Sequence, residues 1–439
     1  MADGPRLTIS RSAALMLLFA LSLTVKLAGV AYMNRNLGWN LVAPDARDSY
    51  VPLAKDLAQG KGYQLEGNHL AATKLAPAYP LFLAAVYRIA GFDVPTWVFG
   101  VLNALMRAAT TLLVFALAAR AFGERAGSVA AVIHAVDPWE AFWTAFVLKE
   151  SLAVLLSIAG IYLAVRALER PTWLRGGLAG AVIGLASLTR FATLGFFFVL
   201  LALFAVAATR GRIATHTALR LAAAATFGVV LALSPWLARN MSLLGGPFVY
   251  TQAGLYLFVS NGPGAERAPD TKGYSGLSTG DLTNVPAVYR RKRPYARREA
   301  ELVSTTVTHV ATHPFVFARL VAARVVNMWR PTFAGSSWSN LIVLGLPYCV
   351  MLAAAIAGVA IGVRHPPSPA QQVLYWTVGF YVLLHAVFWS EIRYRQYVTP
   401  LLSAFAGYAA VALYDRFHPV RETVSAGHAA IPSASRRGC

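Results

Sequence analysis

Long apolar runs dominate the hydrophobic pattern of this chain, and short polar connections interrupt them. Several runs extend for about 18–22 residues, the length that an α-helix needs to cross a bilayer core. The runs recur from residue 12 to residue 414, so the pattern predicts an all-α polytopic membrane protein with about ten transmembrane helices. We expect these helices at Ser12–Met33, Thr96–Ala119, Ala126–Val136, Lys149–Ala167, Gly176–Leu188, Phe191–Ala208, Thr217–Leu237, Leu341–Val363, Gln371–Trp389 and Tyr397–Tyr414.

Some apolar segments need a separate interpretation. Ala126–Val136 and Gly176–Leu188 are short for a bilayer core and would have to extend or tilt differently. Leu81–Ala90 is too short to span, and we place it on the membrane surface. Ser12–Met33 could be a cleaved signal peptide, but Lys26 interrupts its apolar run and no good cleavage motif follows. An uncleaved first helix is the better interpretation.

A short amphipathic pattern follows the first long helix. Ser49 can cap a helix over Tyr50–Gln59, and Pro52 is tolerated in its first turn. Apolar and charged residues take opposite faces, which is typical of a helix lying on a membrane surface. The acidic residues Asp45 and Asp48 come just before it.

Short basic connections predict the topology and the domain organisation. The positive-inside rule puts these connections and both termini in the cytoplasm. The membrane domain is then residues 1–416, with a first outer loop at 34–95 and a second large outer loop at 239–340. Residues 417–439 form a basic tail that we expect to be disordered. The basic connections are Arg120–Arg125, Arg166–Arg175, Arg210–Arg220, Arg364–His365 and the tail Arg416–Arg437.

Composition agrees with a membrane protein. Of the 439 residues, 57% are hydrophobic and 13% are charged, about half the charged fraction of a soluble protein. The net charge of +20 would suggest nucleic acid in a soluble chain. Here basic loops against anionic lipid explain it, so we expect a bilayer and no nucleic acid as partner. No metal-ligand spacing of Cys or His and no glycine-rich nucleotide loop occurs in the sequence, so no metal and no cofactor is predicted.

The charged residues near predicted helix ends collect mostly on the outer side. A few carboxylates would face many cations there, which suits an anionic leaving group with a carboxylate base. Cations in a low-dielectric site stabilise phosphate, and a hydroxyl acceptor needs a base within hydrogen-bond reach. The residues concerned are Asp45, Asp48, Lys74, Asp137, Glu140, Lys149, Glu150, Arg190, Arg239, Glu391, Arg393 and Arg395.

Each of these residues also has a structural interpretation that the sequence leaves open. Asp48 can be a cap, and Asp137 before Pro138 can be an ordinary helix stop. Glu391 and Arg395 can brace each other as an i,i+4 pair if their segment is helical. Arg107 falls inside a predicted span, where a charge is costly and usually faces a partner or a cavity.

A series of short motifs runs along nearly the whole chain, up to about Tyr414. The first reads Asp45, Tyr50, Leu53-Ala54, Leu57, Gly60-Lys-Gly62-Tyr63, and then Pro77-Ala-Tyr79-Pro80-Leu81. Later ones are Arg120–Arg125, Asp137-Pro138, Leu148–Ser151, Leu188–Arg190, Pro235–Asn240 and Arg393–Leu402. Their order and spacing resemble the GT-C superfamily of polytopic glycosyltransferases. The nearest branches are the protein O-mannosyltransferases, the aminoarabinose-transferase-like enzymes and the RgtA-like bacterial transferases.

The resemblance implies an inverting sugar transfer from a polyprenyl-phosphate donor to a hydroxyl acceptor (a glycan, a lipid or a protein). The reaction would take place on the outer face of a bacterial plasma membrane. The resemblance makes Asp45 the catalytic carboxylate. Mannosyltransferases have an adjacent Asp-Glu pair, and since Ala46 follows Asp45 here, a second carboxylate would be Asp48, Asp137 or Glu140. Candidate phosphate ligands are Lys74, Arg190, Arg393 and Arg395, and the other candidate substrate-binding residues are Tyr50, Tyr79, Glu150 and Arg239.

Two alternative functions remain open at this point. A ligase or polymerase of lipid-linked glycans would use the same chemistry on a whole oligosaccharide. A transporter or flippase of an anionic lipid would instead need functional charges near the bilayer midplane. Apart from Lys26 and Arg107, the charges favour the enzyme because they collect at one face.

Overall fold

The chain is helical throughout the part that its computed structural model describes, residues 10–37, 41–42, 49–65, 67, 69–265, 295–333 and 335–418. Within these ranges the extended pairing is a single isolated bridge between Val42 and Val147. The predicted all-α class is therefore confirmed. The predicted disordered tail lies almost wholly outside the described residues, and the bounds of the predicted domain and loops stay predictions.

Each of the ten predicted spanning segments coincides with a helix. The elements are α1 (Arg11–Leu37), α5 (Thr96–Phe122), α6 (Glu124–Val136), α8 (Glu150–Glu169), α9 (Trp173–Ser187), η3 (Phe191–Leu194) with α10 (Gly195–Thr209), α11 (Thr215–Leu244), α16 (Trp338–Asn340) with η6 (Leu341–Gly345) and α17 (Leu346–Gly362), α18 (Pro369–Val387) and α19 (Thr399–Phe417). Among the described residues, six helices are long and apolar enough to cross a membrane: α1, α5, α8, η3 with α10, α11, and α16 through α17. The number of ten crossings stays a prediction.

Glycines allow the helices of the bundle to pack closely. A Cβ atom on Gly180 of α9 would lie 2.0 Å from the carbonyl oxygen of Ala225 on α11. A Cβ on Gly358 of α17 would lie 2.0 Å from the carbonyl oxygen of Phe405 on α19. Such close backbone approach at small residues is characteristic of helix packing in membranes.

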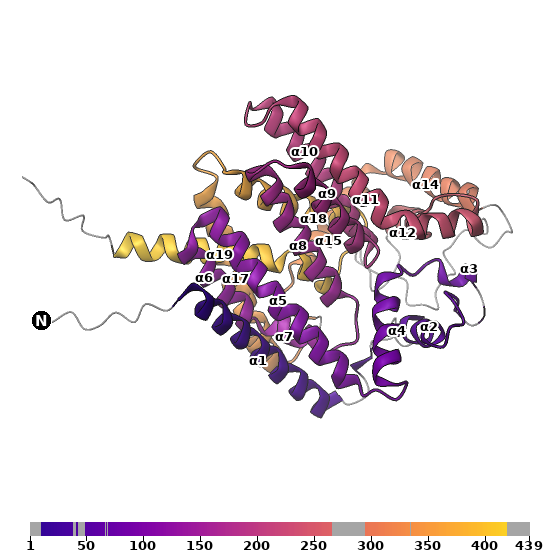
Figure 1. The fold of residues 1–439 in the computed structure, drawn as a ribbon, viewed down its shortest axis with the longest axis horizontal. Coiled ribbons are helices and arrows are strands. Elements are labelled where there is room, and N and C mark those ends of the chain that lie inside the picture. The colour runs from indigo at the N-terminus through magenta and orange to yellow at the C-terminus, as the bar shows by residue number, and fades with distance from the viewer. Residues whose placement is uncertain are drawn as a thin grey trace, which may run out of the picture.

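Five helices of the two predicted outer loops gather at one end of the bundle (Figure 1). They are α2 (Val51–Ala58), α3 (His69–Ala72), α4 (Ala78–Ala90), α12 (Ala253–Asn261) and α14 (Tyr295–Thr312), all at the right of the view. Helix α1 begins and helix α19 ends at the left. These helices of the two predicted outer loops therefore lie together, opposite the terminal ends of the bundle. We call the right-hand end the loop end.

The short surface helices differ from the predictions in detail. α2 begins at Val51, and Tyr50 precedes it without a side-chain cap bond, so Ser49 is not its cap. Pro52 does lie in the first turn. The predicted helix over Leu81–Ala90 begins earlier, at Ala78. The second large loop contains a further helix, α15 (Pro314–Met328).

Candidate functional site

Segments far apart in the sequence bring tyrosines and charged residues together beside α2 and α4. Most of these side chains are buried, and the two cationic ones are half-buried. We call this set the tyrosine–cation cluster. Its members are Tyr50 before α2, Tyr79 on α4, Lys149 and Glu150 at the start of α8, Arg190 before η3, and Tyr394 and Tyr397 on the 3-10 helix η7 (Ile392–Tyr397).

Lys149 and Tyr50 form one side of the cluster. The Nζ of Lys149 donates to the Tyr50 hydroxyl at 2.7 Å and lies 5.0 Å from the centre of the Tyr50 ring. Tyr79 packs edge-on against Tyr50, with ring centroids 5.5 Å apart. Burial raises the pKa of Tyr79 well above its ordinary value, so this phenol stays neutral. The lysine thus meets the ring of Tyr50 on this side, and Tyr79 supports that ring edge-on.

Arg190 supplies the second cation. Its Nη1 lies 3.5 Å from Oε1 of Glu150. Its guanidinium carbon lies 3.9 Å and 4.9 Å from the ring centres of Tyr394 and Tyr397. These tyrosines are three residues apart on a 3-10 helix, whose repeat of three residues per turn puts them on one face. Helix η7 therefore presents Arg190 with a pair of aromatic rings, a favourable arrangement for a cation.

The cluster carries an excess of positive charge. Lys149 and Arg190 face a single carboxylate, Glu150, whose Oε2 is buried without a hydrogen-bond partner among the described residues. A poorly solvated site strengthens the field of an unbalanced cation. The arrangement can therefore bind an anion such as a phosphate, and it offers a free carboxylate oxygen to a neighbouring hydroxyl.

The chain on both sides of residues 43–48 is attached to the start of α8. On one side Val42 forms its bridge with Val147. On the other side Tyr50 accepts the hydrogen bond of Lys149. The two predicted catalytic residues of this stretch, Asp45 and Asp48, lie outside the described residues.

Further aromatic residues of the second loop lie near the cluster. Tyr250 and Tyr256 stack with ring centroids 6.0 Å apart, and Tyr256 meets Trp389 edge-on at 5.2 Å. Burial, together with the nearby Tyr394, raises the pKa of Tyr256.

Lys74, a predicted phosphate ligand, is half-buried on the turn between α3 and α4.

Two predicted substrate-binding arginines donate hydrogen bonds to backbone carbonyls. Arg239 donates to the carbonyl oxygen of Tyr63 at 2.9 Å, and its guanidinium lies 4.9 Å from the Tyr63 ring centre. Arg395 is buried and donates to the carbonyl oxygen of Arg330 at 2.5 Å. Both brace the chain, and the geometry brings neither into the tyrosine–cation cluster.

Arg393 also has a partner of its own. Its Nε lies 2.8 Å from Oε2 of Glu391. The i,i+4 brace that the sequence suggested for Glu391 and Arg395 does not form. The segment is a 3-10 helix, in which residues four apart do not lie above one another.

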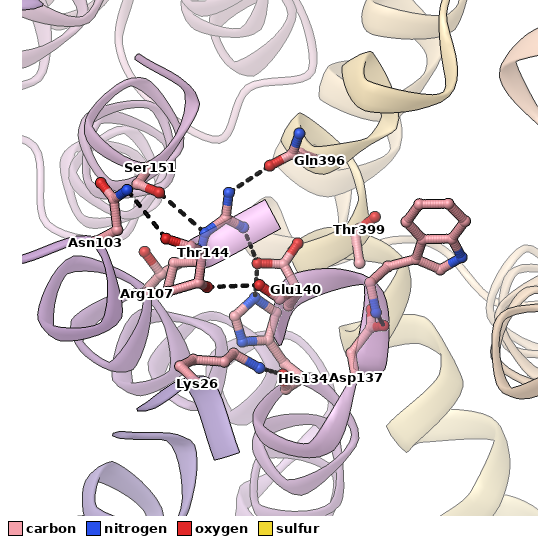
Figure 2. Close-up of polar contacts among 12 residues, drawn as sticks. Lys26, Asn103, Arg107, His134, Asp137, Glu140, Thr144, Ser151, Gln396 and Thr399 are labelled. Atoms are coloured by element: carbon pink, nitrogen blue, oxygen red, sulfur yellow. Dashed lines mark hydrogen bonds and ion pairs between the residues drawn. The ribbon is translucent and has the colours of Figure 1, made fainter. Parts of the chain in front are cut away.

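Figure 2 shows a second set of polar residues, deeper in the bundle. Arg107 on α5 bonds at once to Glu140 on α7 (Pro138–Thr144), to Ser151 on α8 and to Gln396 on η7. Arg107 lies eleven residues after the start of α5, which is about 16 Å along the helix axis. We call this set the Arg107 network. Its other members are Lys26, Asn103, His134, Asp137 and Thr144, which Figure 2 labels, and Thr111, whose hydroxyl lies 2.8 Å from Nδ1 of His134.

Two predicted catalytic residues belong to this interior network. Asp137 caps α7, because its Oδ1 accepts a hydrogen bond from the backbone of Trp139 at 2.8 Å. Glu140 is 1% exposed and pairs with Arg107, so it lies inside the bundle. Its predicted catalytic role stays a prediction. No group of three or more His, Cys, Asp or Glu side chains that could hold a metal occurs in the described ranges.

Comparisons with known proteins agree with this architecture. Residues 74–238 match the family model of dolichyl-phosphate-mannose-protein mannosyltransferases. The oligosaccharyltransferase AglB of Archaeoglobus fulgidus, solved with an inhibitory peptide and a dolichol-phosphate, is similar with a TM-score of 0.57 at 14% identity, over 92% of this chain and 51% of that chain. The chain has a GT-C fold. The resemblance that the sequence motifs suggested is thereby confirmed for the fold.

Two further solved structures are similar to this chain to different degrees. The apo oligosaccharyltransferase of the same organism gives a TM-score of 0.56 at 14% identity, over 93% of this chain and 51% of that chain. ArnT of Cupriavidus metallidurans, solved with undecaprenyl phosphate, gives a TM-score of 0.42 at 13% identity, over 91% of this chain and 78% of that chain. The chain spans about half the length of the archaeal proteins. None of the curated protein sequences compared with it matches significantly.

The sequence anticipated part of the cluster that the GT-C fold assembles. The structure brings together four of the predicted substrate-binding residues, and Lys149 joins them. The tyrosines of η7 were missed, although they lie inside a motif that the resemblance used. Their i,i+3 spacing is the signal that could have found them, once a 3-10 helix is assumed. The four residues are Tyr50, Tyr79, Glu150 and Arg190.

Proposed function

We propose that this protein is a membrane glycosyltransferase that moves a sugar from a polyprenyl-phosphate donor to a hydroxyl acceptor. The observation that carries the proposal is the tyrosine–cation cluster, in which Lys149 and Arg190 outnumber Glu150. Cations in a poorly solvated site stabilise a phosphate as it leaves. The archaeal oligosaccharyltransferase of similar fold was solved with a dolichol-phosphate, which supports a lipid phosphate as ligand.

In this proposal Asp45 is the catalytic base. It takes the proton of the acceptor hydroxyl, and the hydroxyl oxygen forms a bond to the anomeric carbon with inversion. The bond from that carbon to the phosphate oxygen breaks, and the electron pair leaves with polyprenyl phosphate. Lys149 and Arg190 hold the phosphate, with Lys74 as a further cation from the first loop.

The covalent chain supports this assignment of the base. Val42 is paired with Val147, and the three residues from Val42 to Asp45 span at most about 11 Å. Beyond Asp45, Tyr50 contacts Lys149. The proposed base is thus tethered on both sides to the region that would bind the phosphate.

We propose that the loop end faces the outside of a bacterial plasma membrane. The opposite end, where α1 begins and α19 ends (Figure 1), would then be cytoplasmic. The basic connection Arg120–Arg125 lies at that end, because Arg125 pairs with Asp415 of α19 at 2.8 Å. The positive-inside rule supports this orientation.

A second candidate function is the transfer of a whole lipid-linked oligosaccharide. The likeness in fold to an archaeal oligosaccharyltransferase favours it. The chemistry at the phosphate would be the same, since only the glycan on the lipid differs. The size of the donor that the protein accepts distinguishes the two.

Sugar transfer in proteoliposomes tests the proposal. Donors would be polyprenyl-phosphate-linked monosaccharides and oligosaccharides, and the proteins would be wild type, Asp45→Asn and Asp93→Asn. Asp93 is an exposed acid on the same predicted outer loop and serves as the matched control. We expect Asp45→Asn to lose several orders of magnitude in kcat at unchanged expression, and Asp93→Asn to resemble wild type.

The other outcomes are equally informative. Equal activity of Asp45→Asn and wild type would make Asp45 structural and move the base to Asp48. A wild type that transfers nothing from any donor but moves anionic lipid between leaflets would replace the enzyme with a transporter.

A further inference from the structure

We propose that Arg107 is a positioning residue that holds α8 and η7 at the separation that forms the tyrosine–cation cluster. It acts through Ser151 and Gln396. Its effect on donor binding rests on the proposed function, whereas the positioning itself does not.

Arg107 is held from three directions (Figure 2). Its Nε donates to the Ser151 hydroxyl at 3.1 Å, its Nη1 pairs with Glu140, and its Nη2 donates to the side-chain oxygen of Gln396. The side chain is 1% exposed. A charge inside a membrane bundle is costly and marks a functional position by default. The rigid planar guanidinium serves three directions at once, which the single ammonium of lysine cannot do in the same geometry.

Two of the three partners are direct neighbours of the cluster in the sequence. Ser151 follows Glu150 in the first turn of α8, and Gln396 precedes Tyr397 on η7. Arg190 lies between Glu150 and Tyr397. Its surroundings therefore depend on how far apart α8 and η7 are. A side chain bonded to both elements fixes that separation.

The third partner, Glu140, neutralises Arg107 and is held in place itself. Its backbone carbonyl accepts from the Thr144 hydroxyl at 2.6 Å, and Nε2 of His134 lies 3.8 Å from its Oε2. The ion pair has no net charge, so it can fix the geometry without adding to the positive field of the cluster.

Lys26 provides a matched control within the same network. It is also fully buried, and its Nζ donates to the carbonyl oxygens of His134 and Ala135 at 3.0 and 2.8 Å. These bonds end on α6 and not on α8 or η7. Loss of Lys26 should therefore destabilise the bundle without changing the separation of α8 and η7.

Hydrogen exchange on the solubilised full chain, without any ligand, tests the positioning. In Arg107→Lys, the amides of residues 153–157 and those of residues 397–402 other than Pro400 should exchange about tenfold faster, the effect expected for one lost charged hydrogen bond. Lys26→Met should leave both segments as in wild type. The proposal is overturned if Arg107→Lys leaves both segments protected, or if both variants loosen them equally.

Binding of a polyprenyl monophosphate, followed by tryptophan fluorescence, tests the consequence. Arg107→Lys should weaken binding about tenfold, and Lys26→Met should not. If wild type binds no polyprenyl phosphate but the exchange result holds, the proposed function fails and the positioning role stands. If binding weakens while exchange in both segments is unchanged, Arg107 acts in another way and the positioning role fails.

Discussion

The tyrosine–cation cluster and the Arg107 network each contain an arginine next to a glutamate, but the two pairs differ in their surroundings. In the network, Arg107 bonds to Glu140 and also to two neutral side chains. In the cluster, Arg190 approaches Glu150 no closer than 3.5 Å and rests on aromatic rings. A second cation, Lys149, lies beside it.

This difference indicates that the Arg107–Glu140 pair stabilises the bundle, whereas the Arg190–Glu150 pair leaves room for a ligand. The interior pair is neutral and its arginine is bonded on three sides, so an added anion would gain little there. The cluster has one more cation than acid, and a buried oxygen of Glu150 lacks a partner in the described part of the chain. Asp137 Oδ2 and His134 Nε2 of the network also lack a hydrogen-bond partner in the described part of the chain, so the excess of cations, and not the unpartnered oxygen, distinguishes the cluster as a place for an anion.

The largest effect should come from breaking the neutral pair. Glu140→Ala leaves Arg107 as an uncompensated buried charge, and loss of one partner of a buried pair costs about 3–5 kcal/mol. We expect a strongly lowered midpoint of thermal unfolding in detergent. Asp56→Ala, which removes the partner of Lys61 at a surface ion pair of 3.2 Å, should cost less than about 1 kcal/mol. Equal losses in the two variants would contradict the structural role of the Arg107 network.

Removing the arginine of the cluster should reduce activity strongly and thermal stability little, the reverse of what we expect for stability in Glu140→Ala. Arg190→Met should lower kcat/KM for the polyprenyl-phosphate donor by about 10²–10³-fold, because a cation aimed at the leaving phosphate is lost. Thermal stability should fall much less than in Glu140→Ala. Arg239→Met is the matched control, since Arg239 donates to a backbone carbonyl outside the cluster. A similar loss of kcat/KM in both variants would place the phosphate elsewhere.

The long helices that carry both regions could be predicted from the sequence, because an apolar run long enough for a bilayer has few other structures open to it. All ten predicted segments coincide with helices. The need of Arg107 for a partner was predictable for the same reason, since a charge inside a span must be compensated.

The identity of the partners was not predictable. Arg107 reaches Glu140 over 33 residues and Gln396 over 289 residues. Hydrophobic periodicity sets which residues face the interior, but not which interior residues meet. Helix η7 shows a second limit. A 3-10 helix of six residues is too short to be recognised from the sequence, so the i,i+3 spacing of Tyr394 and Tyr397 could not be interpreted beforehand.

The aromatic platform under Arg190 should contribute less than the arginine itself. Tyr394→Leu removes a ring whose centre is 3.9 Å from the guanidinium, and a cation over a ring contributes about 0.5–2 kcal/mol. We therefore expect donor binding to weaken by about 2- to 30-fold, while Tyr394→Phe changes little. Tyr348→Leu removes the comparable ring under Arg395. It should lower thermal stability without a change in donor binding.

The smallest effect tests the Lys149 side of the cluster. Tyr50→Phe removes the hydroxyl that accepts the lysine hydrogen bond at 2.7 Å and keeps the ring 5.0 Å away. The ammonium stays charged and near the ring but loses its fixed orientation. One hydrogen bond is worth about 0.5–1.5 kcal/mol, so KM for the donor should rise by about 2- to 13-fold with kcat nearly unchanged. Steady-state kinetics in proteoliposomes would measure both. An unchanged KM in Tyr50→Phe, together with a large loss in Arg190→Met, would restrict the phosphate to the Arg190 side of the cluster, since Lys149 would then not contribute to its binding.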